Sequence, residues 1–364
     1  MRRIFMCAGG TGGHIYPALS VAHELTCRSD FDVWFIGTRR GMERRLVPEA
    51  GFTLKYIRAR GWDRRWGKAF FRMAGDNFCG FFQACILLLF YRPSGIVCMG
   101  SYVSLIVAFW ARLFRIPVFV HEQNVYPGLA NRMVSRWAKC VYISSEDSLD
   151  YFKNRDTIYI TGNPLRSSVL NWKGRKEEAQ KLLGLDPKRS TVLVFGGSRG
   201  SSVINNTFMD AWYHLIDKNI QVIHVTGPED IDQVQKYSQQ FAGRYLVFEF
   251  LEEPGPAYTA ADIAVCRAGA NTTFELLWFG LPAVMVPYEE ATEGHQQYNA
   301  FWLKKKQAVE VILEKDLTSR KMAVAIGLLL REERGEGEGL PGKAAEKIVD
   351  SILDFYKKEE TPWI

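Results

Sequence analysis

The feature that most constrains this sequence is a pattern that occurs twice: a short apolar strand runs into a glycine-rich turn and then into a helix. The first copy is CAGGTGGHIYPALSVAHEL near the start of the chain, and the second is VFGGSRGSSVINNTF near its middle. After each copy, short apolar runs alternate with segments of helical length. This alternation is typical of a parallel sheet that is covered by helices on both faces. The chain is therefore expected to hold two doubly wound α/β domains.

The length of the chain agrees with two domains, because 364 residues exceed the size at which one hydrophobic core usually stops growing. The boundary is expected near TGNPLRSSVL, where Gly162 and Pro164 interrupt regular structure. We expect a first domain over residues 1–163 and a second over 164–341. The C-terminal helix in 342–364 falls beyond the last expected strand and is expected to pack back onto the first domain.

The composition favours a packed, enzyme-sized body. Hydrophobic residues make up 47% and charged residues 24%, which argues against a disordered chain and against a protein with many membrane spans. The N-terminal segment MRRIFMCAGG lacks the apolar stretch of a secretory signal, so a cytoplasmic location is expected. Cys7, Cys98, Cys140 and Cys266 lie in apolar runs and are expected to be buried reduced thiols.

Two segments bear on membrane contact. The apolar run 78–91 has 14 residues, fewer than the roughly 17–25 that a bilayer crossing needs, and its spacing predicts a largely buried helix. From Arg39 to Arg72 the chain has eleven Lys and Arg against three acidic residues, a net charge of +8, with aromatic residues interleaved. Such a segment suits an anionic membrane surface, and a merely solvated basic face is the alternative.

The first glycine-rich turn lets backbone N–H groups approach a phosphate or sugar oxygen. Its spacing is not G-x-G-x-x-G, and no acidic residue closes the second strand, so an NAD site is disfavoured. Arg39 and Arg40 stand there instead and keep an NADP site open as a weak alternative. His14 stands where the turn becomes helix, at the edge of the sheet where open α/β folds bind ligands. It is a candidate general base, and a structural histidine is the alternative.

The second half carries RAGANTTFE between a strand and a helix. If the helix begins near Ala270, its free N–H groups face a ligand phosphate. Glu275 would then accept hydrogen bonds from ribose hydroxyls, unless it is a solvated helix residue. Further along, His295, Gln296 and Asn299 open a helix with neutral groups that suit sugar hydroxyls, although such residues also begin ordinary helices.

No metal site is expected. Two D-x-D segments, at 30–32 and 230–232, resemble turn or cap residues, and HEQN at 121–124 lacks the second histidine of a zinc helix.

Eight segments, in order and over nearly the whole chain, resemble the family of peptidoglycan N-acetylglucosaminyltransferases with the GT-B fold. The matching segments are GGTGGHIYPALSVA (9–22), GSYVS (100–104), HEQNVYPGLANR (121–132), GNPLR (162–166), GGSRGSSVIN (196–205), RAGANTTFE (267–275), GLPAVMVP (280–287) and HQQYNA (295–300). One such segment is a weak signal, whereas eight in the same order are specific. The chain departs from the family's usual loops at Ser101, Leu105, Ile106, Arg199 and Ser201.

The resemblance implies an α/β protein of GT-B fold, with two doubly wound Rossmann-like domains whose parallel sheets face a central cleft. It implies an inverting transfer of GlcNAc from UDP-GlcNAc to the 4-hydroxyl of the lipid-linked acceptor undecaprenyl-pyrophosphoryl-MurNAc-pentapeptide, without cofactor or metal, by a peripheral protein on the cytoplasmic face of the plasma membrane. The catalytic base would be His14. The residues implied to hold the donor are Arg166, Ser198, Ala270, Thr272, Glu275, Gln296 and Asn299. Those implied to face the acceptor and the reacting centre are Thr11, His14 and Asn124, and Gly12 and Gly13 are further substrate-binding residues.

Other functions remain open from the sequence. A UDP-GlcNAc 2-epimerase, or another GT-B glycosyltransferase, shares the fold and is the nearest alternative. An NADP-dependent reductase is a rival from another enzyme class. The basic stretch also suggests a nucleic-acid binder, but no recognised RNA or DNA module accompanies it, so no nucleic-acid partner is expected.

Overall fold

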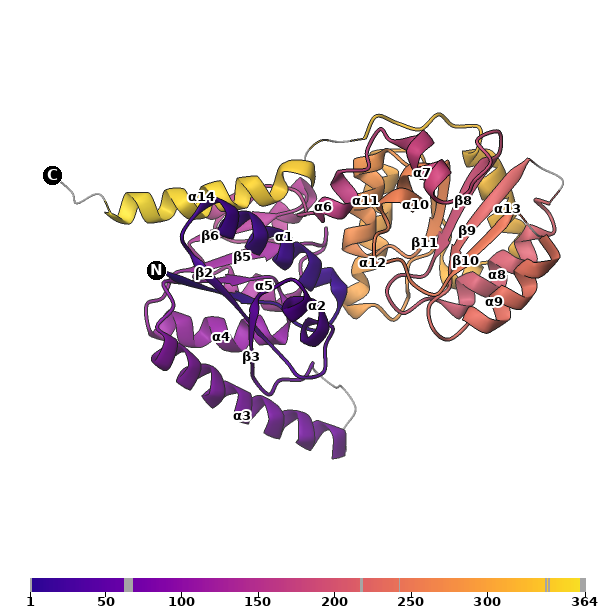
Figure 1. Cartoon of the computed structure of the whole chain (residues 1–364). Helices are drawn as coiled ribbons and strands as arrows, with labels where there is room; N and C mark the ends of the chain where they lie inside the picture. Colours follow the sequence, from indigo (N-terminus) through magenta and orange to yellow (C-terminus); the bar gives the residue numbers. More distant parts are fainter. Residues whose placement is uncertain are drawn as a thin grey trace. The chain divides into compact units, whose positions relative to one another are not determined.

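The computed structural model describes residues 2–61, 68–216, 219–241, 243–337, 339 and 341–360. The chain divides into two compact units, Met1–Arg166 with Leu340–Ile364, and Ser167–Gly339. Each unit is built on one parallel sheet with helices against both faces (Figure 1). The prediction of two doubly wound α/β domains is confirmed.

The first unit has a seven-stranded sheet in the order β3-β2-β1-β4-β5-β6-β7. Its strands are β1 (Arg3–Cys7), β2 (Asp32–Gly37), β3 (Thr53–Tyr56), β4 (Gly95–Cys98), β5 (Val118–Glu122), β6 (Cys140–Ile143) and β7 (Ile158–Ile160). Its helices are α1 (Gly12–Arg28), α2 (Glu43–Glu49), α3 (Lys68–Tyr91), α4 (Ser101–Leu113), α5 (Leu129–Val134) and α14 (Ala344–Glu360). The strand order reverses between β1 and β4, so the loops after these strands flank the point where open α/β sheets bind ligands.

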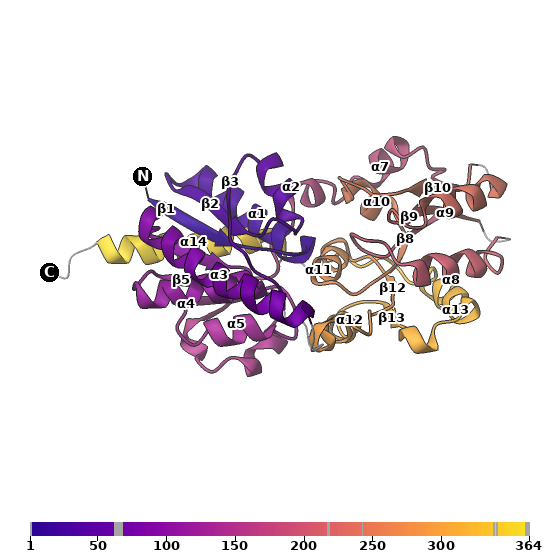
Figure 2. The same ribbon diagram turned by 90° about the horizontal axis from the view of Figure 1, so that it is seen from below.

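Alternate residues of β1 serve the two faces of this sheet, as the pleat of a strand requires. Ile4 and Met6 belong to a buried cluster with α1 and α14, whereas Phe5 and Cys7 belong to a second cluster with α3 and α4. Figure 1 shows these two pairs of helices on opposite faces, and Figure 2 views the unit from the side of α3 and α4. The C-terminal helix α14 is thus part of the core of the first unit.

The helix α3 corrects one expectation. The apolar run was predicted to form a largely buried helix. However, only 22% of an apolar 18-residue stretch of the helix is buried, and Phe78 and Phe90 are 67% and 78% exposed. The segment Arg72–Tyr91 is long and apolar enough to cross a membrane by length and composition alone. The prediction was wrong because α3 buries only one stripe, including Ala84 and Leu88, against the sheet.

The second unit has a six-stranded parallel sheet in the order β10-β9-β8-β11-β12-β13. Its strands are β8 (Ser190–Phe195), β9 (Ile220–Val225), β10 (Tyr245–Phe248), β11 (Ile263–Cys266), β12 (Ala283–Met285) and β13 (Val309–Val311). Its helices are α6 (Ser167–Leu170), α7 (Lys176–Leu182), α8 (Ser202–Trp212), α9 (Ile231–Ser238), α10 (Gly255–Ala260), α11 (Ala270–Phe279), α12 (His295–Lys304) and α13 (Ser319–Leu329). The order reverses between β8 and β11, so the loops into α8 and α11 flank the switch point of this sheet.

The core of the second unit explains why these segments fold together. Val192 and Val194 of β8 pack in one buried cluster with Phe208 and Trp212 of α8 and with residues of α13.

Cys7, Cys98, Cys140 and Cys266 are buried free thiols, as expected from their apolar surroundings.

Candidate functional site

At the switch point of the first unit, His14 is held by a short chain of hydrogen bonds. Its ring lies in the first turns of α1, and its Nδ1 is 3.1 Å from the Oε1 atom of Gln123, which follows β5. The amide nitrogen of Gln123 lies 3.1 Å from Nδ1 of His121 and donates to the carbonyl of Met99 at 2.9 Å. Nε2 of His121 is 3.2 Å from the carbonyl oxygen of Gly162.

These contacts determine the tautomer of each imidazole. Because the amide nitrogen of Gln123 donates to Met99, its oxygen faces His14 and can only accept, so Nδ1 of His14 carries the proton. The lone pair of His14 is therefore on Nε2, as a general base requires. His121 is fully buried, which lowers its pKa to about 4, and as a neutral ring it donates from Nε2 to Gly162.

The buried carboxylate of Glu43, which no sequence pattern singled out, holds the first glycine-rich turn. Its Oε2 accepts a hydrogen bond from the backbone N–H of Gly10 at 3.1 Å, and its Oε1 accepts two from Thr38 at 2.8 Å. A Cβ atom at Gly41 would overlap this carboxylate, so glycine is needed there. The signal that could have found Glu43 is a carboxylate placed directly after a Gly-Met step, at the start of the helix that follows β2.

Glu122, at the end of β5, shapes the loop that contains Asn124. It is 1% exposed, and its carboxylate accepts from the N–H of Asn124 at 2.9 Å, from the N–H of Gly128 at 3.1 Å and from the amide of Asn131 at 2.8 Å. Burial raises the pKa of Glu122, and these hydrogen bonds oppose the shift. Asn124 is therefore fixed at the same sheet edge as His14.

The loop after β4 closes the surroundings of His14. Gly100 has a φ of 91°, and a Cβ atom there would lie 3.0 Å from Cε1 of His14. The following Ser101 has a φ of 77°, a backbone conformation that favours glycine. A glycine at this position would avoid the strain that serine carries here.

In the second unit the helix α11 begins at Ala270, as predicted, directly after the switch-point strand β11. Its first N–H groups have no partner within the helix and carry the positive end of the helix dipole. Glu275 is 5% exposed, so the alternative of a solvated helix residue is wrong. Tyr258 donates a hydrogen bond of 2.7 Å to its Oε2 atom. Thr272 is half-buried on the same first turns.

Two residues at the start of α12 that were predicted to bind the sugar donor also hold the loop before α11. Oε1 of Gln296 accepts hydrogen bonds from the backbone N–H groups of Ala268 at 3.2 Å and of Tyr288 at 2.9 Å. Asn299 is fully buried and donates to the carbonyl of Ala268 at 3.0 Å. Their roles toward a sugar stay predictions, and their contacts show that they fix the loop before α11.

The second glycine-rich turn carries Ser198, which is exposed, and two departures from the family pattern. Ser201 caps α8 by accepting from the N–H of Ile204, and it also accepts from the guanidinium of Arg267 at 2.9 Å. Arg267 pairs with Glu314 at 3.1 Å. The departure at Ser201 thus supplies a helix cap and a partner for Arg267.

The predicted residues fall into two groups, and each sheet brings the members of one group to its own switch-point edge. Thr11, Gly12, Gly13, His14 and Asn124 lie at the switch-point edge of the first unit, and Ser198, Ala270, Thr272, Glu275, Gln296 and Asn299 lie at that of the second. Arg166 ends the first unit, with its guanidinium 4.1 Å from the centre of the Tyr16 ring.

Neither D-x-D segment is arranged as a metal site. Asp32 pairs with Arg3 at 2.6 Å, and Asp230 accepts from Asn205 at 2.7 Å. Within the described ranges, no group of three or more His, Cys, Asp or Glu side chains is placed to hold a metal ion.

Comparisons with known proteins agree with this geometry. Residues 4–143 match the N-terminal domain of glycosyltransferase family 28, and residues 191–351 match its C-terminal domain. The chain is 38% identical to the UDP-N-acetylglucosamine–N-acetylmuramyl-(pentapeptide) pyrophosphoryl-undecaprenol N-acetylglucosamine transferase of Caldanaerobacter subterraneus, over 91% of this chain and 92% of that protein. It is 36% identical to the protein of the same name from Desulfitobacterium hafniense, over 97% and 99%.

Solved structures are similar over nearly the full length. The crystal structure of Acinetobacter baumannii MurG superposes with a TM-score of 0.72 at 27% identity and covers 98% of this chain and 100% of that one. A UDP-GlcNAc 2-epimerase from Neisseria meningitidis, bound to UDP-GlcNAc, superposes with a TM-score of 0.68 at 14% identity, over 97% and 100%. The second likeness shows the fold alone.

Proposed function

The chain belongs to the family of UDP-N-acetylglucosamine–N-acetylmuramyl-(pentapeptide) pyrophosphoryl-undecaprenol N-acetylglucosamine transferases, and from that premise we propose how its residues divide the reaction. The chain is a glycosyltransferase of peptidoglycan synthesis that moves GlcNAc from UDP-GlcNAc to the lipid-linked MurNAc-pentapeptide. The second unit binds the donor, and the first unit binds the acceptor and supplies the base.

The donor diphosphate lies at the N-terminus of α11, near Ala270 and Thr272. Helix N–H groups and the glycine-loop amides beside Ser198 meet the charge that leaves with UDP. The ribose hydroxyls donate to Glu275, whose carboxylate is oriented by Tyr258. Gln296 and Asn299 bind the sugar, and Arg166 is a further donor contact. Because both D-x-D segments already hold other side chains, this arrangement is proposed to work without a bound metal.

The acceptor hydroxyl is activated by His14. Nε2 of the neutral ring takes the proton from the 4-hydroxyl of MurNAc as that oxygen attacks the anomeric carbon of GlcNAc, and the bond to the UDP oxygen breaks on the opposite face. The sugar configuration is thereby inverted. The observation that carries this proposal is the hydrogen bond from Nδ1 of His14 to Gln123, which leaves Nε2 with the lone pair. Thr11, Gly12, Gly13 and Asn124 contact the acceptor.

The membrane-facing surface of the chain is formed by α3 and α4 of the first unit. Apolar side chains that are at least 44% exposed gather on these two packed helices: Phe78, Phe82, Ile86, Leu89, Phe90, Phe109 and Leu113. An exposed apolar surface of this kind suits the interface of a bilayer, where the lipid-linked acceptor resides. The proposed location is peripheral, on the cytoplasmic face of the plasma membrane. Trp62, Arg64, Arg65 and Trp66 of the expected basic segment lie outside the described residues.

One assay tests the proposal: transfer of labelled GlcNAc from UDP-GlcNAc to the lipid-linked MurNAc-pentapeptide, with and without EDTA. The expected result is a β-linked product whose yield EDTA does not change. Formation of free UDP and a 2-epimer without a lipid product would assign the chain to the epimerases instead. Loss of all activity in EDTA, restored by Mn²⁺, would contradict the metal-free arrangement.

A further inference from the structure

The loop between β2 and α2 holds the first glycine-rich turn through both polar backbone groups of Gly10. The N–H of Gly10 donates to Oε2 of Glu43 at 3.1 Å, and its carbonyl oxygen accepts from the N–H of Met42 at 3.2 Å. The turn that leads into His14 is therefore shaped by the loop after the neighbouring strand.

The surroundings of Glu43 are built for a carboxylate. The side chain is fully buried, and its Oε1 accepts from the N–H and from the hydroxyl of Thr38, both at 2.8 Å. A Cβ atom would lie 3.3 Å from Oε1 at Gly9, 2.6 Å from Cγ at Gly37 and 1.9 Å from Oε2 at Gly41. Because an apolar side chain would fill this space without removing a charge from water, the hydrogen bonds of the carboxylate account for its presence.

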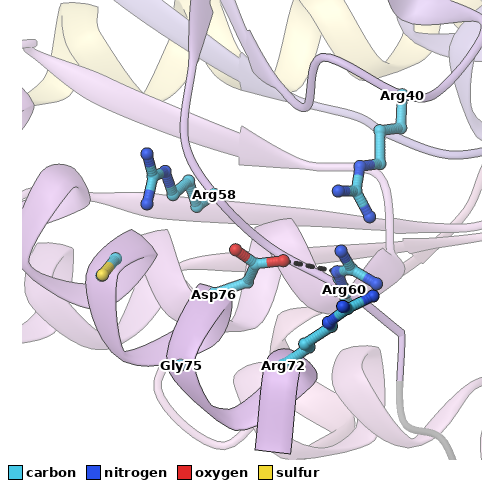
Figure 3. Close-up of a pocket in the computed structure, with 7 residues that line it drawn as sticks. Arg40, Arg58, Arg60, Arg72, Gly75 and Asp76 are labelled. Atoms are coloured by element: carbon cyan, nitrogen blue, oxygen red, sulfur yellow. Dashed lines mark hydrogen bonds and ion pairs between the residues drawn. The ribbon is translucent and has the colours of Figure 1, made fainter. Parts of the chain in front are cut away.

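Glu43 also brings a negative charge to the start of α1. Within the described ranges of the chain, its carboxylate makes no ion pair with a cationic side chain. Arg40 of the same loop extends instead into a hollow of about 520 Å³, which Arg58, Arg60 and Arg72 also line (Figure 3). The first turn of α1 has no acidic residue of its own. Glu43 thus places a carboxylate beside a helix N-terminus, where N–H groups otherwise attract a phosphate.

We propose that Glu43 is a positioning residue that shapes the first glycine-rich turn for the uncharged sugar of the acceptor and keeps the acceptor's diphosphate away from it. This inference rests on the proposed function, in which the 4-hydroxyl of MurNAc meets Nε2 of His14. The diphosphate is attached to C1 of MurNAc, across the ring from the 4-hydroxyl, so the turn that adjoins His14 meets the sugar. The negative charge behind Gly10 repels phosphate but leaves hydrogen bonds to hydroxyl groups unaffected.

The isosteric variant Glu43→Gln tests this inference, because it removes the charge and one acceptor atom while keeping the size of the side chain. Its single oxygen is expected to stay with the two donors of Thr38, which leaves the N–H of Gly10 facing an NH₂ group. The KM for the lipid-linked acceptor should rise about five- to tenfold, with the donor KM within about twofold of wild type. Glu49→Gln, at the exposed end of the same helix, is the control and should change neither value.

Thr38→Val separates positioning from packing. It removes one hydrogen bond from the same carboxylate but keeps the charge and the bond to Gly10. It should lower the stability of the first unit about as much as Glu43→Gln does, yet raise the acceptor KM by less than about twofold. An equal rise in both variants would reduce Glu43 to a packing role. A lower acceptor KM in Glu43→Gln would place the diphosphate at the turn, and an unchanged one would show that the turn does not need the carboxylate; each of these results overturns the proposal.

Hydrogen exchange tests the hold on Gly10 without turnover. The amide of Gly10 should exchange at least about fivefold faster in Glu43→Gln than in wild type or Glu49→Gln, as expected for the loss of one hydrogen bond. Unaltered exchange at Gly10 would refute positioning by Glu43 and leave the proposed function intact. A wild-type chain that transfers no GlcNAc to the lipid-linked acceptor would refute the proposed function, and with it the assignment of the turn to MurNAc, even if exchange at Gly10 responds as expected.

Discussion

In the turn between β1 and α1, Gly10 and Gly13 leave open space, whereas in the turn between β8 and α8, Gly200 packs against the loop after β9. A Cβ atom at Gly10 would meet no described atom within 4 Å, and one at Gly13 would make only an ordinary contact. A Cβ atom at Gly200 would lie 2.1 Å from the carbonyl oxygen of Thr226. Gly10 and Gly13 are free to face a ligand, whereas Gly9 and Gly12 lie close to neighbouring side chains, and Gly200 is required by packing.

The starts of the two helices differ in the same sense. Thr11 makes no capping hydrogen bond from its side chain at the start of α1, whereas Ser201 caps α8 and is itself bound by Arg267. In the second unit the helix start proposed to face the ligand is that of α11. A glycine-rich turn therefore locates the switch point of a sheet, but its individual glycines differ: Gly197 leaves room for a ligand, whereas Gly200 packs against the loop after β9.

The largest effect is expected at the first turn. His14→Ala should lower kcat by roughly 10²–10⁴-fold, the usual range for a lost general base, while UDP affinity stays nearly unchanged. Steady-state transfer kinetics and a UDP titration of the same folded protein measure both quantities. If the variant keeps kcat within about threefold at neutral pH, water or another group takes the proton, and the first turn does not supply the general base.

The contrast in packing predicts opposite outcomes for two alanine substitutions. Gly200→Ala should reduce the free energy of unfolding by about 2–4 kcal/mol, because the site combines a φ of 77° with a backbone atom in the way. Gly13→Ala should leave unfolding within about 1 kcal/mol, since alanine suits a helix, and should raise the KM for the acceptor. Hydrogen exchange in each unit separates the two unfolding reactions. A stable Gly200→Ala protein would remove the distinction between the turns.

Each unit also buries one histidine, and burial lowers the pKa of His121 to about 4 and that of His224 to about 3. Below an unfolded pKa of about 6.5, the unfolded state binds more protons than the folded one. Stability should therefore fall with decreasing pH by about 1.4 kcal/mol per pH unit for each histidine, down to about pH 4 in the first unit and pH 3 in the second.

Substitution of one buried histidine tests this pH dependence unit by unit. His224→Gln should flatten the slope in β9 while leaving that of the first unit intact, as followed by hydrogen exchange between pH 7 and 5. The exposed His214→Gln is the control for loss of an imidazole from the same unit. An unchanged slope in β9 would show that His224 is not the group that titrates.

At the start of α11, Glu275→Ala should weaken UDP binding at least about tenfold, or about 1.4 kcal/mol, as expected for a lost charge-assisted contact. Tyr258→Phe removes the hydroxyl that donates to Glu275 and leaves the carboxylate in place, so it should weaken UDP binding by about threefold. Calorimetric titration with UDP compares the two. Wild-type affinity in Glu275→Ala would take this residue out of the donor site.

The sequence was informative where a local pattern dictates geometry. The strand, turn and helix order predicted both sheets, and the rule that ligands bind at strand ends selected His14 and the start of α11. Contacts between distant segments were not readable in this way: Glu43 lies 33 residues from Gly10 and Gln123 lies 109 residues from His14. The exposure of the apolar face of α3 could not be predicted, because an apolar run has the same sequence pattern whether protein or lipid covers it.

A modest effect is expected at Gln123, and it bears most directly on the first turn. Its amide can present only the oxygen to His14, because its nitrogen donates to Met99. Gln123→Leu removes the acceptor for Nδ1–H, so the ring loses its preference for a lone pair on Nε2, and kcat should fall by about three- to tenfold with donor KM unchanged. Gln123→Glu places a carboxylate beside Nδ1 and stabilises the protonated ring, so the acid limb of the kcat profile should move up by about one pH unit. A role in packing alone would lower the stability of both variants without moving that limb. The same pH profile in wild type and Gln123→Glu would therefore show that the hydrogen bond to His14 does not prepare the base.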